Sequence, residues 1–167
     1  NNTKIKNFDN FTYILYLKSQ HENFNKKEKI VYESNRYIII HHDKNADRIK
    51  FTSGFYGNET SDDTYWRWMD TEGKLNIYTA KTKSVFFEAE LMASPGQKYI
   101  DCSIFLNGTL LAEYRGEKSY QLKKVLDLVD GENTLTIHSN VKSLLPGNGD
   151  QRKMTLMLKN YDFKEVK

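Results

Sequence analysis

The sequence has few of the residues that cross-link a chain or interrupt its regular structure. Its 167 residues include one cysteine, two prolines and nine glycines. The single cysteine, Cys102, excludes a disulfide within one copy of the chain, so cysteine usage does not assign a redox compartment. Little proline and glycine together with 13% aromatic residues is typical of a chain that folds. At this length, one compact domain is expected.

Long hydrophobic runs and blocks of like charge are also missing. The longest apolar stretches, residues 13–17 and 37–40, are far shorter than the roughly 18 residues that a bilayer-spanning helix needs. Lysine and arginine number 25 and aspartate and glutamate 22, which gives a net charge of +3 without a basic cluster. Nucleic acid is therefore not an expected partner.

Standard catalytic and metal-binding motifs are absent as well. There is no phosphate-binding GxxxxGK[ST] or GxGxxG, no GxSxG nucleophile motif, no CxxC and no HExxH. His41 and His42 are adjacent, so on a strand their side chains point to opposite faces and do not grip one ion. Glu59, Asp62 and Asp63 offer oxygens to a cation but match no dedicated calcium loop. We expect no metal and no cofactor.

What the sequence does contain is alternation of apolar and polar residues, dominant from Phe51 onward. This period of two, interrupted by turn residues, predicts an all-β protein with an antiparallel β-sandwich of jelly-roll type. Asn107-Gly108 lies between two such segments and is typical of a tight type I′ hairpin. The clearest candidate strands are residues 84–92, 99–106, 109–114, 134–139 and 153–159.

Two segments of this region predict other structures. Residues 65–69 and 75–79 are separated by Asp70-Thr71-Glu72-Gly73, a turn cluster that predicts a hairpin. Residues 120–129 carry apolar side chains at a spacing that fits a short helix. The apolar residues of that pattern are Leu122, Val125, Leu126 and Val129.

Residues 1–48 form a separate N-terminal element in this interpretation, followed by the sandwich domain at 49–167. Residues 30–32 and 37–41 flank a Ser-Asn turn and predict a small hairpin, and residues 11–17 fit either a strand or a helix. The N-terminal element is thus expected to be a hairpin or a small α/β unit. The chain opens without an initiator Met or a signal sequence, so we interpret it as a mature fragment or an excised domain.

An aromatic cluster is the most distinctive feature. On a strand, Trp66 and Trp68 share one face and Tyr65, Arg67 and Met69 share the other, so one set can be core and the other exposed. Exposed aromatic rings stack on sugar rings while polar neighbours bind the hydroxyls, which makes Tyr56, Tyr65 and Trp66 candidate sugar-binding residues. Trp68 is assigned to the core beside Arg67.

Other candidate chemistry is less specific. Glu88 and Glu90 lie on one strand face, with Cα atoms roughly 6 to 7 Å apart, a separation similar to that of glycosidase carboxylate pairs. Alternating acids are also ordinary on the solvent face of a sandwich. Cys102 lies on the apolar face of its strand, which favours a buried, inert thiol. No catalytic residue is therefore assigned.

Several segments, taken in order, resemble a known group of domains. These are Gly54-Phe55-Tyr56-Gly57-Asn58-Glu59, then Tyr65-Trp66-Arg67-Trp68-Met69, then Phe105-Leu106-Asn107-Gly108 and Gly131-Glu132-Asn133-Thr134-Leu135. The pattern resembles the β-sandwich at the extracytoplasmic end of polytopic membrane glycosyltransferases and related membrane proteins. The hairpin expected at 30–41 also looks like one that often precedes that sandwich. Similar motifs occur in carbohydrate-binding jelly rolls.

The resemblance implies a non-catalytic accessory domain, tethered outside the cytoplasm to the membrane-embedded portion of the same protein. That portion would hold the lipid donor and the catalytic acid of glycan transfer, and Glu59, Arg67 and Trp68 would be structural. The first alternative is a carbohydrate-binding module of a secreted or surface protein, whose partner is a glycan. The second is a glycoside hydrolase that uses Glu88 and Glu90 or Glu59.

Overall fold

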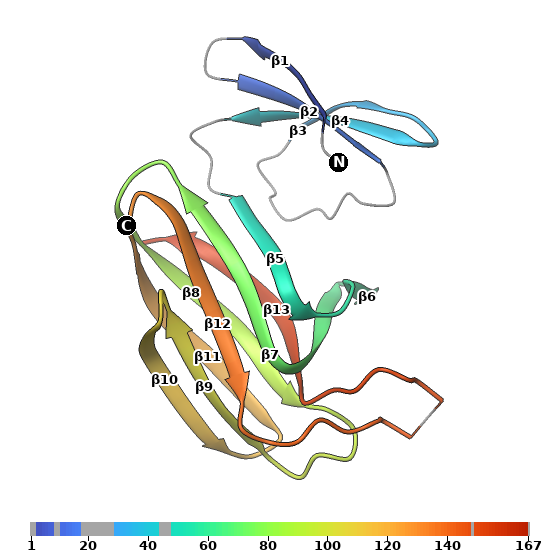
Figure 1. The fold of residues 1–167 in the computed structure, drawn as a ribbon, viewed down its shortest axis with the longest axis vertical. Coiled ribbons are helices and arrows are strands. Elements are labelled where there is room, and N and C mark those ends of the chain that lie inside the picture. Colours follow the sequence, from blue (N-terminus) through green and yellow to red (C-terminus); the bar gives the residue numbers. More distant parts are fainter. Residues whose placement is uncertain (1–2, 9–10, 18–28, 44–47, 148, 167) are drawn as a thin grey trace.

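The computed structural model in Figure 1 describes residues 3–8, 11–17, 29–43, 48–147 and 149–166. These residues form thirteen β-strands in two separate sheets, and every strand pair is antiparallel. The prediction of an all-β protein is confirmed. No helix in this described part of the chain has the length and apolar character needed to cross a membrane.

The N-terminal sheet has four strands in the order β1-β2-β4-β3. The β3–β4 pair confirms the hairpin predicted at residues 30–41, and residues 11–17 are a strand. The chain's division into 1–48 and 49–167 stays a prediction. The bounds of the strands are β1 (Thr3–Phe8), β2 (Phe11–Leu17), β3 (Lys29–Glu33) and β4 (Tyr37–Asp43).

The second sheet has nine strands and forms the sandwich. Seven of them follow the order β10-β9-β12-β7-β13-β8-β11, while β5 and β6 pair with β7 outside this path. The bounds are β5 (Arg48–Phe55), β6 (Glu59–Ser61), β7 (Thr64–Thr79), β8 (Lys83–Ala93), β9 (Ile100–Leu106), β10 (Thr109–Gly116), β11 (Ser119–Leu128), β12 (Gly131–Ser139) and β13 (Leu156–Glu165).

Strand β7 is 16 residues long and belongs to both layers of the sandwich. Its second half pairs with β12 and β5, and its first half pairs with β13 and β6. One layer therefore contains β10, β9, β12, β7 and β5, and the other contains β7, β13, β8 and β11 (Figure 1).

The hairpin predicted at residues 70–73 is wrong, because β7 continues through this segment. Gly73 is not a turn residue here. It is buried beneath the Phe55 ring, and an added Cβ would lie 2.4 Å from that ring. The glycine therefore permits close packing of β5 on β7 instead of a reversal of the chain.

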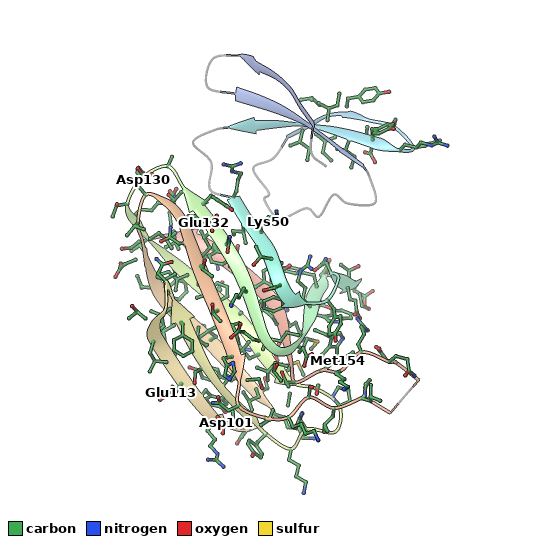
Figure 2. All side chains as sticks on the ribbon, viewed as in Figure 1. Lys50, Asp101, Glu113, Asp130, Glu132 and Met154 are labelled. Carbon is green, nitrogen blue, oxygen red and sulfur yellow. The ribbon has the colours of Figure 1, made fainter. Side chains whose placement is uncertain are left out.

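The side chains between the layers form one hydrophobic core, which fills the interior in Figure 2. Period-2 alternation buries every second residue along most of β8 and β12 and in the second half of β7, as the sequence predicts. Among its members are Met69, Leu75 and Ile77 of β7, Phe87, Ala89 and Leu91 of β8, Cys102 and Ile104 of β9, Leu135 and Ile137 of β12, and Leu156 and Leu158 of β13.

The helix predicted at residues 120–129 is also wrong, because this segment is strand β11. Leu122 and Leu126 are buried, but Val125 is 49% exposed on the opposite face. Residues four apart share a face in a strand as well as in a helix, so their spacing was ambiguous. The Asn107-Gly108 hairpin between β9 and β10 is confirmed, with φ of 51° at Asn107 and 81° at Gly108.

Candidate functional site: a tryptophan strip on the outer face

The first half of β7 presents different residues to the two sides of its layer. Arg67 and Met69 point into the sandwich and are 2% and 0% exposed. Trp66 and Trp68 alternate with them, are partly exposed, and so lie on the outer face. The predicted separation of the two faces is confirmed, but the assignment of Trp68 to the core is wrong. The alternation fixes which residues share a face and does not say which face is buried.

The partners of Trp68 across the layer extend this outer surface. Trp68 is opposite Met157 of β13, which is opposite Met92 of β8. Directly opposite residues on antiparallel strands point the same way, with Cβ atoms about 5 Å apart. All three side chains are partly exposed. We call the surface formed by Trp66, Trp68, Met157 and Met92 the tryptophan strip.

Polar side chains border the strip in the next row of the layer. Trp66 is opposite Lys159, which is opposite Glu90. The Nζ of Lys159 lies 3.1 Å from a carboxylate oxygen of Glu90. The other oxygen of Glu90 accepts a hydrogen bond of 3.0 Å from the hydroxyl of Ser119. The hydrogen-bonding groups of Lys159 and Glu90 therefore lie directly beside the apolar row formed by Trp68, Met157 and Met92.

Tyr56 continues the surface on the other side of β7. Its backbone N–H donates to the carbonyl of Trp68 at 2.8 Å, so Tyr56 lies opposite Trp68 and its side chain points outward. The Tyr56 hydroxyl donates to the backbone carbonyl of Lys153 at 2.9 Å. Burial of the ring raises the pKa of Tyr56, so the hydroxyl keeps its proton and its donor role.

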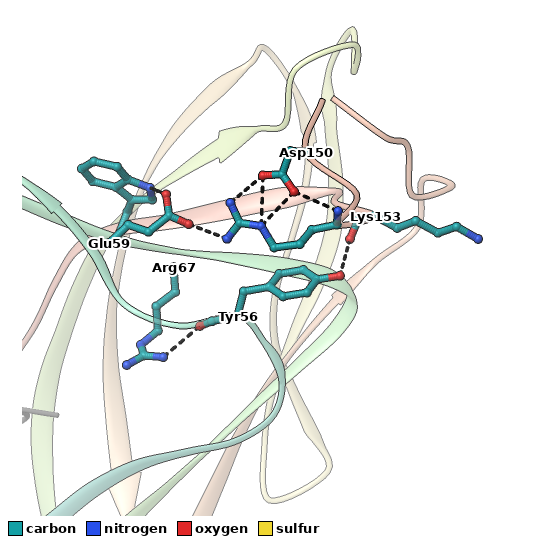
Figure 3. Close-up of polar contacts among 7 residues, drawn as sticks. Tyr56, Glu59, Arg67, Asp150 and Lys153 are labelled. Atoms are coloured by element: carbon teal, nitrogen blue, oxygen red, sulfur yellow. Dashed lines mark hydrogen bonds and ion pairs between the residues drawn. The ribbon is translucent and has the colours of Figure 1, made fainter. Parts of the chain in front are cut away.

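Arg152 joins the loop before β13 to this surface. Its guanidinium lies between two carboxylates, with Nη1 at 2.5 Å from Glu59 and Nη2 at 2.6 Å from Asp150 (Figure 3). The second oxygen of Glu59 accepts a hydrogen bond of 3.2 Å from the indole nitrogen of Trp66. The guanidinium also lies 5.4 Å from the centre of the Tyr56 ring. We call Arg152, Asp150 and Glu59 the arginine clamp.

The clamp shifts the pKa values of Asp150 and Arg152. Hydrogen bonds from Arg152 lower the pKa of Asp150, and the two carboxylates raise the pKa of Arg152. Asp150 and Arg152 are therefore charged at neutral pH and neutralise one another in part. Sequence reasoning missed Arg152 because it is 93 residues from Glu59 and no local pattern marks it.

Arg67 supports the same segment from inside the sandwich. Its Nη1 donates to the carbonyl of Tyr56 at 2.9 Å, and its guanidinium lies 4.4 Å from the centre of the Phe51 ring. Figure 3 shows this contact beside the clamp. The predicted structural residues Glu59 and Arg67 thus hold Tyr56 and Trp66 from opposite faces of the layer.

Tyr65 is not brought to the outer surface. It lies on the same face of β7 as Arg67, and its ring packs edge-on against Tyr161 with centroids 5.0 Å apart. Its hydroxyl donates to the carbonyl of Tyr161 at 2.5 Å, and burial raises its pKa. Of the three predicted sugar-binding residues, the structure groups Tyr56 and Trp66 and separates Tyr65 from them.

The carboxylates considered for hydrolysis are engaged in ion pairs. Glu88 pairs with Lys164, and this contact lowers the pKa of the Glu88 carboxyl. A glycosidase general acid needs the opposite shift, a raised pKa that keeps its proton near neutral pH. Glu90 pairs with Lys159 and Glu59 with Arg152. Each of the three carboxylates therefore has a cation beside it.

Within the described residues, no three or more His, Cys, Asp or Glu side chains are grouped so that they could hold a metal ion. The Glu59 carboxylate, considered for calcium, is already bonded to Trp66 and Arg152. The side chains of His41 and His42 lie outside those the structure describes.

Cys102 is buried in the core, as predicted. Burial, with a smaller contribution from Asp101, raises the pKa of its thiol to about 11. Since the thiolate is the reactive form, we expect the folded protein to resist alkylation by iodoacetamide at pH 8 and the urea-unfolded protein to react fully. Mass spectrometry of the two samples tests this. Rapid labelling without denaturant would contradict the burial of the thiol.

No protein-family model matches the chain, and no curated protein resembles it closely enough to count as a match. Among solved structures, a family 35 carbohydrate-binding module from an environmental isolate is 9% identical. That match covers 71% of this chain and 97% of the module, with a TM-score of 0.44.

Two further structures are similar at the same level. A family 35 module from Clostridium thermocellum is 10% identical, with 70% of this chain and 91% of that chain covered and a TM-score of 0.41. One from Paenibacillus barcinonensis is 13% identical, with 71% and 89% covered and a TM-score of 0.39. Because all three TM-scores are below 0.5, the proposals below rest on the residues of this chain.

Proposed function

We propose that this protein is a non-catalytic carbohydrate-binding domain and that the tryptophan strip is its glycan-binding surface. The observation that carries the proposal is the partial exposure of Trp66 and Trp68 on the outer face of a regular layer, in line with Met157 and Met92. Apolar side chains are normally placed in the core, and the polar face of a strand meets water. Two tryptophans on the solvent-facing side of a strand indicate a ligand-binding surface.

Sugars fit the chemistry of this surface. The C–H faces of a pyranose ring pack against an indole, and the hydroxyls need nearby hydrogen-bonding groups. Lys159 and Glu90 supply these groups on one side of the strip, and Tyr56 and the arginine clamp lie on the other. Glu88, Glu90 and Glu59 are each paired with a cation, and the pKa of Glu88 is lowered, the opposite of what a catalytic acid needs, which favours binding without hydrolysis.

Intrinsic fluorescence gives a selective test, because Trp66 and Trp68 are the only two tryptophans in the chain. Binding of a soluble oligosaccharide should change the emission saturably, and no reducing sugar should be released. Open stacking sites bind weakly, so we expect a dissociation constant of ~1 mM, which corresponds to a binding free energy of about 4 kcal/mol. Trp68→Ala should weaken binding by about tenfold or more.

Phe86→Ala is the matched control. Phe86 is another partly exposed aromatic residue on the outer face of the same layer, but it lies opposite Val125 and Lys164, away from the strip. Its removal should leave the affinity unchanged. The single-tryptophan variants Trp66→Phe and Trp68→Phe then show which indole senses the sugar. Equal losses in Trp68→Ala and Phe86→Ala would contradict a binding site at the strip.

The setting of the domain is a separate proposal. We propose, from the sequence resemblance alone, that the domain lies outside the cytoplasm and belongs to a membrane protein involved in glycan transfer or surface polysaccharide. A glycan-binding surface suits this setting, since such a domain would meet either the acceptor or the growing polymer. The full-length reading frame tests it, because apolar segments of about 20 residues would have to accompany this chain.

A further inference from the structure

Four cations on the outer face of this layer and in the arginine clamp have carboxylate partners on the same surface. Lys159 pairs with Glu90, Lys164 with Glu88, and Arg152 with both Glu59 and Asp150. Lys123 lies opposite Glu88 and lowers the pKa of that carboxyl. Each of these four cations therefore has a carboxylate partner close by.

This pairing determines which sugars the surface suits. An acidic polysaccharide carries a carboxylate on nearly every ring. A carboxylate placed against an indole loses its hydrating water, and the four cations named above are already paired with other carboxylates. To bind it, a lysine would first have to leave its own carboxylate. A neutral sugar binds without breaking these ion pairs, because its hydroxyls form hydrogen bonds with paired charged groups as well as with unpaired ones.

The shape of the surface indicates which part of a polysaccharide it binds. Tyr56, directly after β5, is followed across the layer by Trp68, Met157, Met92 and Ser119 on β7, β13, β8 and β11. With neighbouring strands about 4.8 Å apart, this row is about 19 Å long, room for about four sugar rings. These residues belong to a continuous sheet face, which favours an internal stretch of chain over a terminal sugar.

We infer that the ligand is a neutral, linear polysaccharide whose chain lies across the strands of the β7-β13-β8-β11 layer. This inference rests on the proposed function and specifies its ligand class. Affinity should rise from the disaccharide to about the tetrasaccharide and then level off, because only about four rings fit on the row. Binding should be insensitive to salt, because no net charge is exchanged.

Matched ligand pairs test the inference. Cellohexaose and mannohexaose are each compared with the corresponding uronic acid hexamer, in which a carboxylate replaces the hydroxymethyl group of each ring. We expect a neutral hexamer to bind at least about tenfold more tightly than its acidic counterpart. Its affinity should be the same at about 50 mM and about 500 mM NaCl, over which the screening length falls severalfold.

The variant Glu90→Gln tests the role of charge pairing directly. It releases Lys159 beside Trp66, so the affinity for the uronic acid hexamer should rise by about fivefold, the factor that one surface ion pair provides. Glu88→Gln removes the Glu88 partner of Lys164, which keeps Asp162 at 3.8 Å and lies opposite Phe86, away from the strip, so this variant should change nothing. Circular dichroism and the emission spectra of both variants check that the fold is intact.

The outcomes separate the inference from the proposed function. Tighter binding of a neutral hexamer that depends on Trp68 supports both. Tighter binding of a uronic acid hexamer that also depends on Trp68 overturns the neutral ligand and leaves carbohydrate binding in place. Failure of every hexamer and of the insoluble polysaccharides cellulose, mannan and xylan to bind the folded protein overturns both.

Discussion

Replacing Gly54 with alanine is expected to destabilise the protein by about 4 kcal/mol or more, or to prevent folding. Gly54 has φ of +72°, in the left-handed region that disfavours other residues. An added Cβ would also lie 1.6 Å from the carbonyl oxygen of Glu72 in β7. The obstacle is backbone, so no side-chain movement relieves it. Strand β5 would have to separate from β7, and Tyr56 would leave the position opposite Trp68.

Gly57→Ala is the control for this result. Gly57 lies three residues further along, without a positive φ, and an added Cβ would meet nothing within 4 Å. Its replacement should change the free energy of unfolding by no more than about 0.5 kcal/mol. Urea denaturation followed by circular dichroism measures both variants. If Gly54→Ala unfolded at the same urea concentration as the unchanged protein, the close contact of β5 with β7 would be contradicted.

Replacing Asn133 with alanine is expected to lower the free energy of unfolding by about 3 kcal/mol. This side chain is 0% exposed, and its amide nitrogen donates to the carbonyl of Val129 at 2.8 Å. Its amide oxygen accepts from the N–H of Val129 and from the side chain of Asn107, both at 3.0 Å. Asn133→Ala would leave several buried polar groups unpaired and would separate the β9–β10 hairpin from the loop before β12.

Two further variants sharpen this prediction. Asn133→Asp keeps the acceptor but replaces the donor that meets the Val129 carbonyl, so it should destabilise the protein to a similar degree. Asn140→Ala removes an exposed asparagine whose amide donates to Asp101 at 2.8 Å, and should cost about 0.5 kcal/mol or less. A small effect of Asn133→Ala in urea denaturation would show that water replaces the lost bonds.

Period-2 alternation predicted the sandwich because each strand buries one face against the other layer. It succeeded at β8 and β12, where every second residue of 85–91 and 133–139 is buried. It failed at residues 70–73, because turn propensity is local and the burial of Gly73 under Phe55 depends on a distant pairing. It also failed at β11, where Leu122 and Leu126 share a face in a strand and in a helix.

The candidate site was predicted only in part, for a related reason. Sequence spacing correctly placed Trp66 and Trp68 on one face of a strand, but which face meets the core depends on the whole sheet. Met157 and Met92 join the strip through strand pairing, and Arg152 through a loop. The sequence shows residues that lie close along the chain, whereas this surface collects residues from β7, β8, β13 and the loops beside them.

The length of β7 has a consequence for how the domain responds as a whole. Because one strand forms hydrogen bonds in both layers, neither layer opens to solvent without disrupting residues that the other layer needs. Unfolding should therefore be a single cooperative event for the sandwich. A ligand bound to the outer face of one layer would then stabilise both layers equally against unfolding, because the two layers share one folded state.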